Sequence, residues 1–233
     1  MLRRFFGLSA VVIMILSLLA HAALVPLAEK ALTRVAARLP AEDVEIRIVS
    51  FPAWELLQGR IDRMNFRARG VQLKEIALDE LHGEFHGIEV SWWQLWYQNQ
   101  LDYALEVPGE VTCILSERNL QDYLSQRLNV PLEELQVTIY GEQVELTAMW
   151  SVAGQRLPLL LRGRLELVPP DTVKLLPERI QVGNFAPGPE IQKRLLGNTD
   201  FQLPLESLPF ELEFYKLEGE QGKIKLHGRV FKE

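Results

Sequence analysis

The sequence is poor in the residues that carry most protein chemistry. Its 233 residues include one cysteine and four histidines, so an intramolecular disulfide is impossible. Cys113 alternates with apolar neighbours in VTCIL, which predicts a buried thiol on a strand. No phosphate-cradling glycine loop, dinucleotide fingerprint or Gly-x-Ser-x-Gly elbow occurs. We therefore expect a protein that is not an enzyme and that has no cofactor.

Clustered positive charge is also missing. The formal net charge is −6, and no run of five basic residues occurs. Because counterion release from phosphates needs a clustered basic surface, nucleic acid is not an expected partner. An acidic chain also adheres poorly to anionic lipid. Any membrane affinity must therefore be mainly apolar or come from an anchor.

The histidines and carboxylates show no catalytic or metal-binding pattern. His82 and His86 in HGEFHG alternate with apolar residues as on a strand. That spacing puts them roughly 13 Å apart along one polar face, too far to share an ion. We expect no metal site. Asp62, Asp79 and Glu89 resemble ordinary surface charge.

The N-terminus combines positive charge with an apolar run. Arg3 and Arg4 precede sixteen mostly apolar residues, 5–20. This is the pattern of an export signal, whose positive end stays in the cytoplasm while the following chain lies outside.

Two fates of this segment remain open. The small residues at 20–22 fit a cleavage site, whereas the apolarity that resumes up to Ala28 completes an uncleaved span. We expect residues 1–23 to anchor the chain at the outer face of the cytoplasmic membrane, in the cell envelope. Cleavage after Ala22 would instead make the protein secreted.

An amphipathic helix is predicted after this segment. Apolar residues recur at three- and four-residue steps between Leu24 and Leu39, and Pro40 ends the pattern. The helix can lie on lipid or pack on the sheet that follows, and we expect packing.

The remaining chain is predicted to be mostly strands, forming one domain over residues 24–233. Met64, Phe66 and Ala68 alternate with charged residues, and the same pattern recurs up to Val230. Two short helices are predicted, over residues 116–128 and 188–197.

The most unusual stretch is SWWQLWYQNQ, residues 91–100, with three of the five tryptophans. It repeats the pattern of SFPAWELLQG, residues 50–59, which predicts two strand, helical turn, strand units. Two interpretations remain for its aromatic side chains: a packed cap of the core, or a surface that meets a bilayer or a ligand. The candidates for lipid or membrane contact, with the contacts of the region around Ala28 undefined, are Trp54, Trp92, Trp93, Trp96 and Tyr97.

Several stretches together carry a family resemblance. They are SFPAWELLQGRIDRMNFRARGVQLKEIALDEL, GIEVSWWQLW, ILSERNLQDYL and LPFELEFYKLEGEQGKIKLHGRV. In this order they resemble the LmeA-like phospholipid-binding proteins of bacterial envelopes, over roughly residues 24–232. The resemblance implies an α+β, mainly antiparallel fold similar to tubular lipid-binding domains. In such a fold a strongly curved sheet wraps around a long N-terminal helix and leaves an apolar groove.

The resemblance implies phospholipid and the cytoplasmic membrane as partners, with lipid transfer or envelope maintenance as the role. It supplies no catalytic motif and no oligomeric state. The alternative is a membrane-tethered scaffold that does not transport lipid. A remote alternative is an envelope hydrolase, which needs a His, a carboxylate and a Ser or Cys in one pocket.

Overall fold

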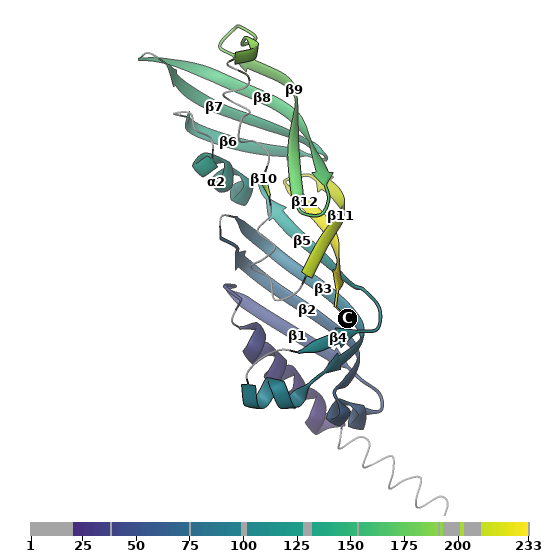
Figure 1. The fold of residues 1–233 in the computed structure, drawn as a ribbon. Helices are drawn as coiled ribbons and strands as arrows, with labels where there is room; N and C mark the ends of the chain where they lie inside the picture. Colours follow the sequence, from purple (N-terminus) through teal and green to yellow (C-terminus); the bar gives the residue numbers. More distant parts are fainter. Residues whose placement is uncertain are drawn as a thin grey trace, which may run out of the picture.

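The computed structural model describes residues 21–37, 39–74, 76–98, 102–127, 132–152, 154–190, 192, 201–202 and 211–232. This part of the chain contains two antiparallel sheets and a few helices, arranged along one elongated body (Figure 1). The prediction of a mainly antiparallel β architecture preceded by a helix is confirmed.

The first sheet has seven strands in the order β1-β2-β3-β5-β12-β11, with β4 paired to β3. They are β1 (Asp43–Val49), β2 (Arg60–Gln72), β3 (Ala77–Val90), β4 (Tyr103–Leu105), β5 (Gly109–Ser116), β11 (Glu211–Glu220) and β12 (Lys223–Phe231). The predicted alternation is confirmed: on β2, Phe66 and Ala68 are buried while Arg67 is exposed. One face of the sheet is therefore apolar and the other charged.

The second sheet has five strands in the order β10-β9-β8-β7-β6. They are β6 (Leu132–Tyr140), β7 (Gln143–Val152), β8 (Gln155–Val168), β9 (Thr172–Val182) and β10 (Phe201–Gln202). A single sheet was the wrong expectation. Helix α2 (Glu117–Arg127) separates β6 from β5, and β12 takes the edge of β5 that β6 would need. The described strands of neither sheet close into a ring.

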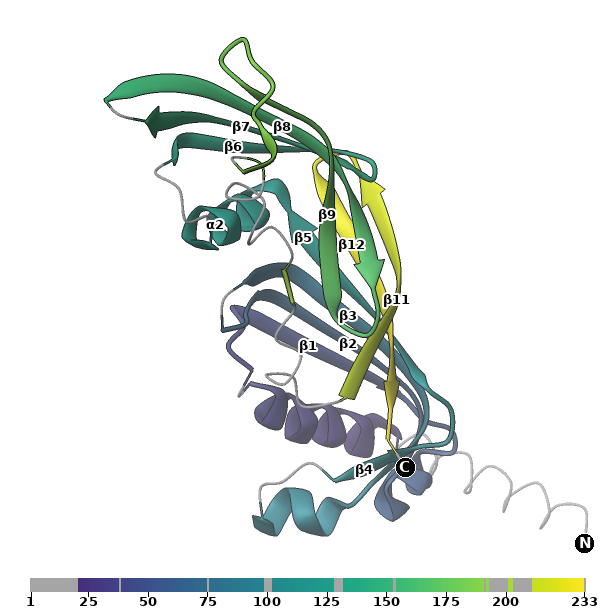
Figure 2. The same cartoon turned by 45° about the horizontal axis from the view of Figure 1, so that its top comes forward.

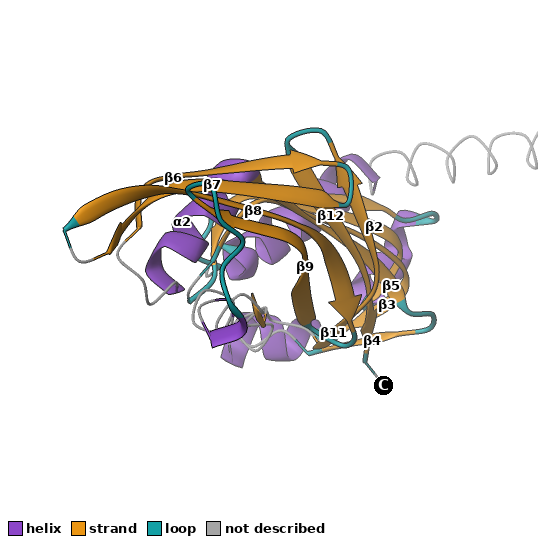
Figure 3. Cartoon of the chain, turned by 90° about the horizontal axis from the view of Figure 1, so that it is seen from above, coloured by secondary structure: helices purple, strands orange, loops and turns teal. Residues whose placement is uncertain are grey.

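Helix α2 confirms the prediction for residues 116–128. Ser116 precedes it, and the Ser116 hydroxyl accepts a hydrogen bond from the Asn119 N–H at 3.5 Å. Leu120, Tyr123 and Leu124 are buried in the same cluster as residues of β6 and β7, and α2 lies beneath these strands in the view of Figure 3. The helix predicted over residues 188–197 lies largely outside the described residues.

The N-terminal helix, residues 21–36 of the described chain, packs on the first sheet. Val25, Ala28 and Leu32 are buried in the core cluster. The Glu29 carboxylate accepts a hydrogen bond from the backbone N–H of Ile48 at 2.9 Å, which satisfies a donor on the free edge of β1. The expected packing on the sheet is confirmed, and Figure 2 shows the helix beside β1 and β2.

The two sheets share one core and meet at a close backbone contact. A Cβ at Gly219 of β11 would lie 1.7 Å from the carbonyl oxygen of Gly141, in the turn between β6 and β7. Nearby, the Gly222 N–H donates to the carbonyl of Ile139 at 3.1 Å. Side chains of both sheets belong to one buried cluster, for example Phe214 and Leu146.

Candidate functional site

The two repeated segments form matching units. The first is β1, η1 (Ala53–Gln58) and β2; the second is β3, η2 (Gln94–Gln98) and β4. Gly59, with φ +86°, ends η1, and its carbonyl accepts a hydrogen bond from the Val90 N–H at 2.7 Å. The predicted strand, helical turn, strand pattern is confirmed, and backbone contact brings the two turns to the same end of the molecule (Figures 1 and 2).

Trp92 connects the two turns. Its indole N–H donates a hydrogen bond to the carbonyl oxygen of Leu56 in η1. The side chain is half-buried, and its ring centroid lies 6.4 Å from that of Trp96, with 44° between the planes. Trp92 is therefore a structural member of the aromatic stretch.

The other aromatic side chains of the two turns point to the outside. Trp93 and Tyr97, one turn apart, stack with centroids 3.9 Å apart, and both are more than 60% exposed. Trp54 of η1 is 46% exposed. We call the exposed apolar side chains at this end the aromatic patch: Leu27, Phe51, Trp54, Leu57, Trp93, Trp96 and Tyr97.

A small apolar pocket lies within this end. It has a volume of about 170 Å³ and is lined by side chains of the N-terminal helix, η1 and η2: Leu24, Leu27, Ala28, Leu56, Leu57, Trp92 and Trp96. None of the described residues that line it is charged. Because pockets for drug-sized ligands usually measure about 300–1,000 Å³, this one is too small to enclose a whole ligand of that size.

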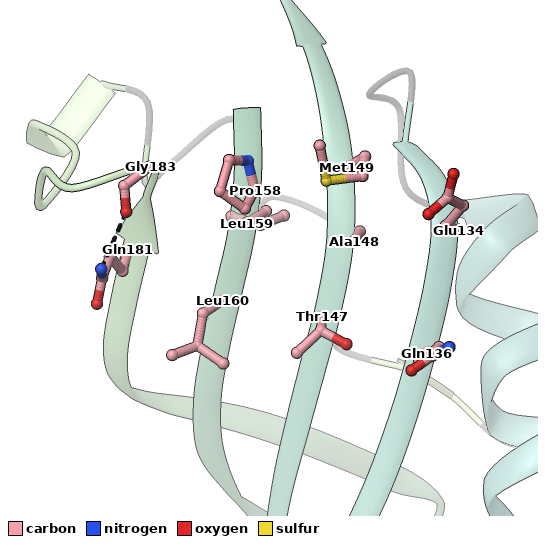
Figure 4. A pocket seen from close by; sticks show the side chains of 10 residues that line it. All are labelled: Glu134, Gln136, Thr147, Ala148, Met149, Pro158, Leu159, Leu160, Gln181 and Gly183. Carbon is pink, nitrogen blue, oxygen red and sulfur yellow. Dashed lines mark hydrogen bonds between the residues drawn. The ribbon is translucent and has the colours of Figure 1, made fainter. Parts of the chain in front are cut away.

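A larger hollow of about 380 Å³ lies on the second sheet (Figure 4). It is lined by Glu134, Gln136, Thr147, Ala148, Met149, Pro158, Leu159, Leu160, Gln181 and Gly183. Thr147, Pro158 and Gln181 alternate with buried or half-buried apolar neighbours, so they face away from the core. With polar groups around an open rim, this hollow does not suit acyl chains.

The residues considered for catalysis do not converge. His82 and His86 are exposed on β3, as predicted, and His86 Nε2 lies 3.0 Å from Glu84. Cys113 is buried, and burial raises the pKa of its thiol well above the usual range, which keeps it protonated and unreactive. Within the described residues, no group of three His, Cys, Asp or Glu side chains could hold a metal ion.

Two of the carboxylates have structural roles. Asp62 accepts a hydrogen bond from the Phe51 N–H at 2.7 Å, and Asp79 accepts one from the Ser116 N–H at 2.6 Å. They bind backbone donors at strand ends. The expectation that they are ordinary surface charge was therefore too simple, whereas Glu89 does lie in an exposed pair with Arg60 at 3.5 Å.

One hydrogen-bonded relay crosses the charged face of the first sheet. The Thr112 hydroxyl lies 3.1 Å from His227 Nδ1, and His227 Nε2 lies 3.1 Å from Glu218. Their order resembles a nucleophile, base and carboxylate. The three residues are neighbours on β5, β12 and β11, and neither pocket described above includes them, so we interpret the relay as cross-strand pairing.

The comparison with protein families finds a match over most of the chain. The model of the LmeA-like phospholipid-binding family matches residues 17–229, nearly the whole chain. The chain belongs to this family. Searches of curated proteins and of solved structures find no match. Among the described residues of this LmeA-like chain, no helix is long and apolar enough to cross a membrane. Most of the predicted anchor, residues 1–20 of the segment 1–23, lies outside the described residues.

Sequence reasoning found the aromatic turns but not the whole patch. Leu27, Phe51 and Leu57 were not predicted as contacts. Exposed apolar residues near a turn can indicate an interaction surface, and this signal could have identified them. The region around Ala28 is now defined: Ala28 is buried at the base of the small pocket, while Leu27 is exposed.

Proposed function

We propose that this chain is a membrane-associated envelope protein that binds phospholipid acyl chains and meets the bilayer with its aromatic patch. Family membership supports lipid binding. The observation that carries the membrane contact is the exposure of Trp54, Trp93, Trp96 and Tyr97 on two turns that also line one apolar pocket. Aromatic side chains with a polar tip favour the interface between headgroups and hydrocarbon.

The apolar interior supports a path for acyl chains beyond the pocket. A second buried cluster, Ala148 and Leu159, lies on the inner face of the second sheet, on strands β7 and β8. Leu135 and Ile180 are only partly buried, and they pack against both this cluster and the main core. Apolar side chains therefore continue from one sheet to the other. An acyl chain that entered along these side chains would be stabilised by about 0.8 kcal/mol for each methylene that becomes buried.

The aromatic patch also fits the expected position of the chain. Leu24, Leu27 and Ala28 line the small pocket together with residues of both turns, and they follow the apolar residues 5–20 in the sequence. An anchor at residues 1–23 would hold this end against the outer face of the cytoplasmic membrane. Sequencing the N-terminus of the mature protein tests this: a first residue at Ala23 would show that the segment is cleaved and the protein secreted.

Fluorescence quenching tests the membrane contact. Four of the five tryptophans lie at the aromatic end, and Trp150 lies on β7. We expect brominated phosphatidylcholine in reconstituted vesicles to quench a full-length variant that retains only Trp93, with the other four tryptophans replaced by phenylalanine so that the patch stays aromatic. A variant that retains only Trp150 should be quenched much less. Equal quenching of both would contradict the proposed orientation.

Lipid extraction tests the binding function separately. Phospholipid that co-purifies with the detergent-washed protein, identified by mass spectrometry, would support it. The second candidate, a tethered scaffold without lipid transport, is favoured by the small size of the apolar pocket, about 170 Å³. A protein free of lipid that neither takes up nor transfers lipid between vesicles would support the scaffold.

A further inference from the structure

Two cations follow the apolar start of the N-terminal helix on its exposed side. Leu27, Lys30 and Arg34 are spaced by three and four residues and are all exposed, so they lie on one face of the helix. Ala28 and Leu32 are buried on the other side. Along this outer face, the side chains change from apolar to basic within two turns.

These two cations have no carboxylate partner in the described part of the chain. By contrast, Arg60, Arg63 and Arg69 of β2 each lie within 3.8 Å of a carboxylate on a neighbouring strand. The acidic residue of the helix itself, Glu29, binds the edge of β1. Lys30 and Arg34 are therefore available to an external anion.

Lys30 and Arg34 follow Leu27, a member of the aromatic patch, along the same helix. At a rise of 1.5 Å per residue, Lys30 lies about 4.5 Å and Arg34 about 10.5 Å beyond Leu27 along the helix axis. The headgroup layer on each side of a bilayer is roughly 5–8 Å thick. If Leu27 lies at the hydrocarbon boundary and the helix axis points away from the bilayer, Lys30 lies within the headgroup layer and the long side chain of Arg34 extends back to it.

We propose that Lys30 and Arg34 bind the headgroups of anionic phospholipid in the membrane that the aromatic patch contacts. The inference rests on the proposed function, because it needs the aromatic end at a bilayer. The net charge of −6 does not exclude it: charges farther away than about 8–10 Å are largely screened at physiological salt. Two local cations can therefore select anionic lipid on a chain that is acidic as a whole.

The test uses the full chain in vesicles of phosphatidylcholine and phosphatidylglycerol at one fixed ratio. Two vesicle preparations are compared: in one the phosphatidylcholine is brominated, and in the other the phosphatidylglycerol. In each, we measure the fluorescence quenching of the variant that retains only Trp93. We expect stronger quenching by brominated phosphatidylglycerol, and this preference should weaken at high salt. The double substitution Lys30→Gln, Arg34→Gln should abolish the preference, since each cation strengthens attraction to an anionic surface on the order of fivefold.

The matched control is Arg118→Gln with Arg179→Gln. These exposed arginines also lack a carboxylate partner within the described chain, but they lie on α2 and β9. The control removes the same charge and should retain the preference. Equal quenching by both labels in the parent would overturn the inference while leaving the membrane contact intact. Absence of quenching by either label would overturn the membrane contact, and this inference with it.

Discussion

The indole of Trp92 donates its hydrogen bond to the backbone of Leu56, so a side chain of the second turn supports the first. Substitution Trp92→Phe keeps a ring but leaves the Leu56 carbonyl without this donor. We expect a loss of about 1 kcal/mol in the free energy of unfolding, measured by chemical denaturation. Trp93→Phe, at an exposed position, is the control. An equal loss in both variants would contradict the structural role of Trp92.

Exposed aromatic residues should affect lipid uptake more than stability. Trp93→Ser removes an exposed ring, and we expect it to change the free energy of unfolding by less than about 0.5 kcal/mol. The same variant should take up less lipid from vesicles. Melting temperature and vesicle-to-protein lipid transfer are measured on each variant. If stability and uptake fall together, the ring belongs to the structure and not to a lipid contact.

The contact between the two sheets should tolerate no side chain at Gly219. A Cβ there would lie 1.7 Å from one backbone atom of Gly141 and 2.0 Å from another, so Gly219→Ala must push the sheets apart. We expect a loss of about 1–3 kcal/mol. Gly188→Ala is the control, because a Cβ there has nothing within 4 Å. Similar melting temperatures for both variants would contradict the close contact.

Tyr103 should make the protein sensitive to alkali. Burial, with the charge of Glu211, raises the pKa of its phenol from 10.0 to about 12. The folded state therefore holds the phenol proton more tightly than the unfolded state. This contribution to stability is complete below about pH 10 and is lost as the pH rises towards 12.

The substitution Tyr103→Phe tests this sensitivity. It removes the phenol hydroxyl, which is buried without a hydrogen-bond partner, so stability at neutral pH should not fall. Melting temperatures of parent and variant are compared on both sides of about pH 10. The melting temperature of the variant should fall less at high pH, and parallel curves would contradict the assignment.

The two sheets should unfold together. Residues of both contribute to one buried cluster, so exposing the apolar face of one sheet exposes that of the other. We expect a single transition, with coincident curves from circular dichroism and tryptophan fluorescence. Two well-separated transitions would show that the sheets are independent domains.

Local patterns predicted the local structure well. Alternation placed Phe66 and Ala68 on a buried face, and the helix predicted over residues 116–128 is present as α2. These patterns depend only on whether a residue faces the core or water, and neighbouring residues carry that information.

Long-range pairing was harder to predict. The sequence does not indicate that β12 lies between β5 and β11, because many apolar strands could pair with β5 equally well. The sequence also does not indicate that Trp92 is half-buried while Trp93 is exposed. Which of these two adjacent residues faces the interior depends on how η1 and η2 contact each other.

The position of β12 has a consequence for the order of folding. The strands β6, β7, β8 and β9 pair with their neighbours in sequence, so this sheet can form from local hairpins. The first sheet cannot be completed in the same way, because β5 ends at Ser116 while β12 begins at Lys223. Until β12 pairs with it, this edge of β5 has unpaired backbone N–H and C=O groups that strands of other chains can bind. The chain is therefore most prone to aggregate before β12 is available, and a chaperone that covers this edge of β5 would protect it most at that stage.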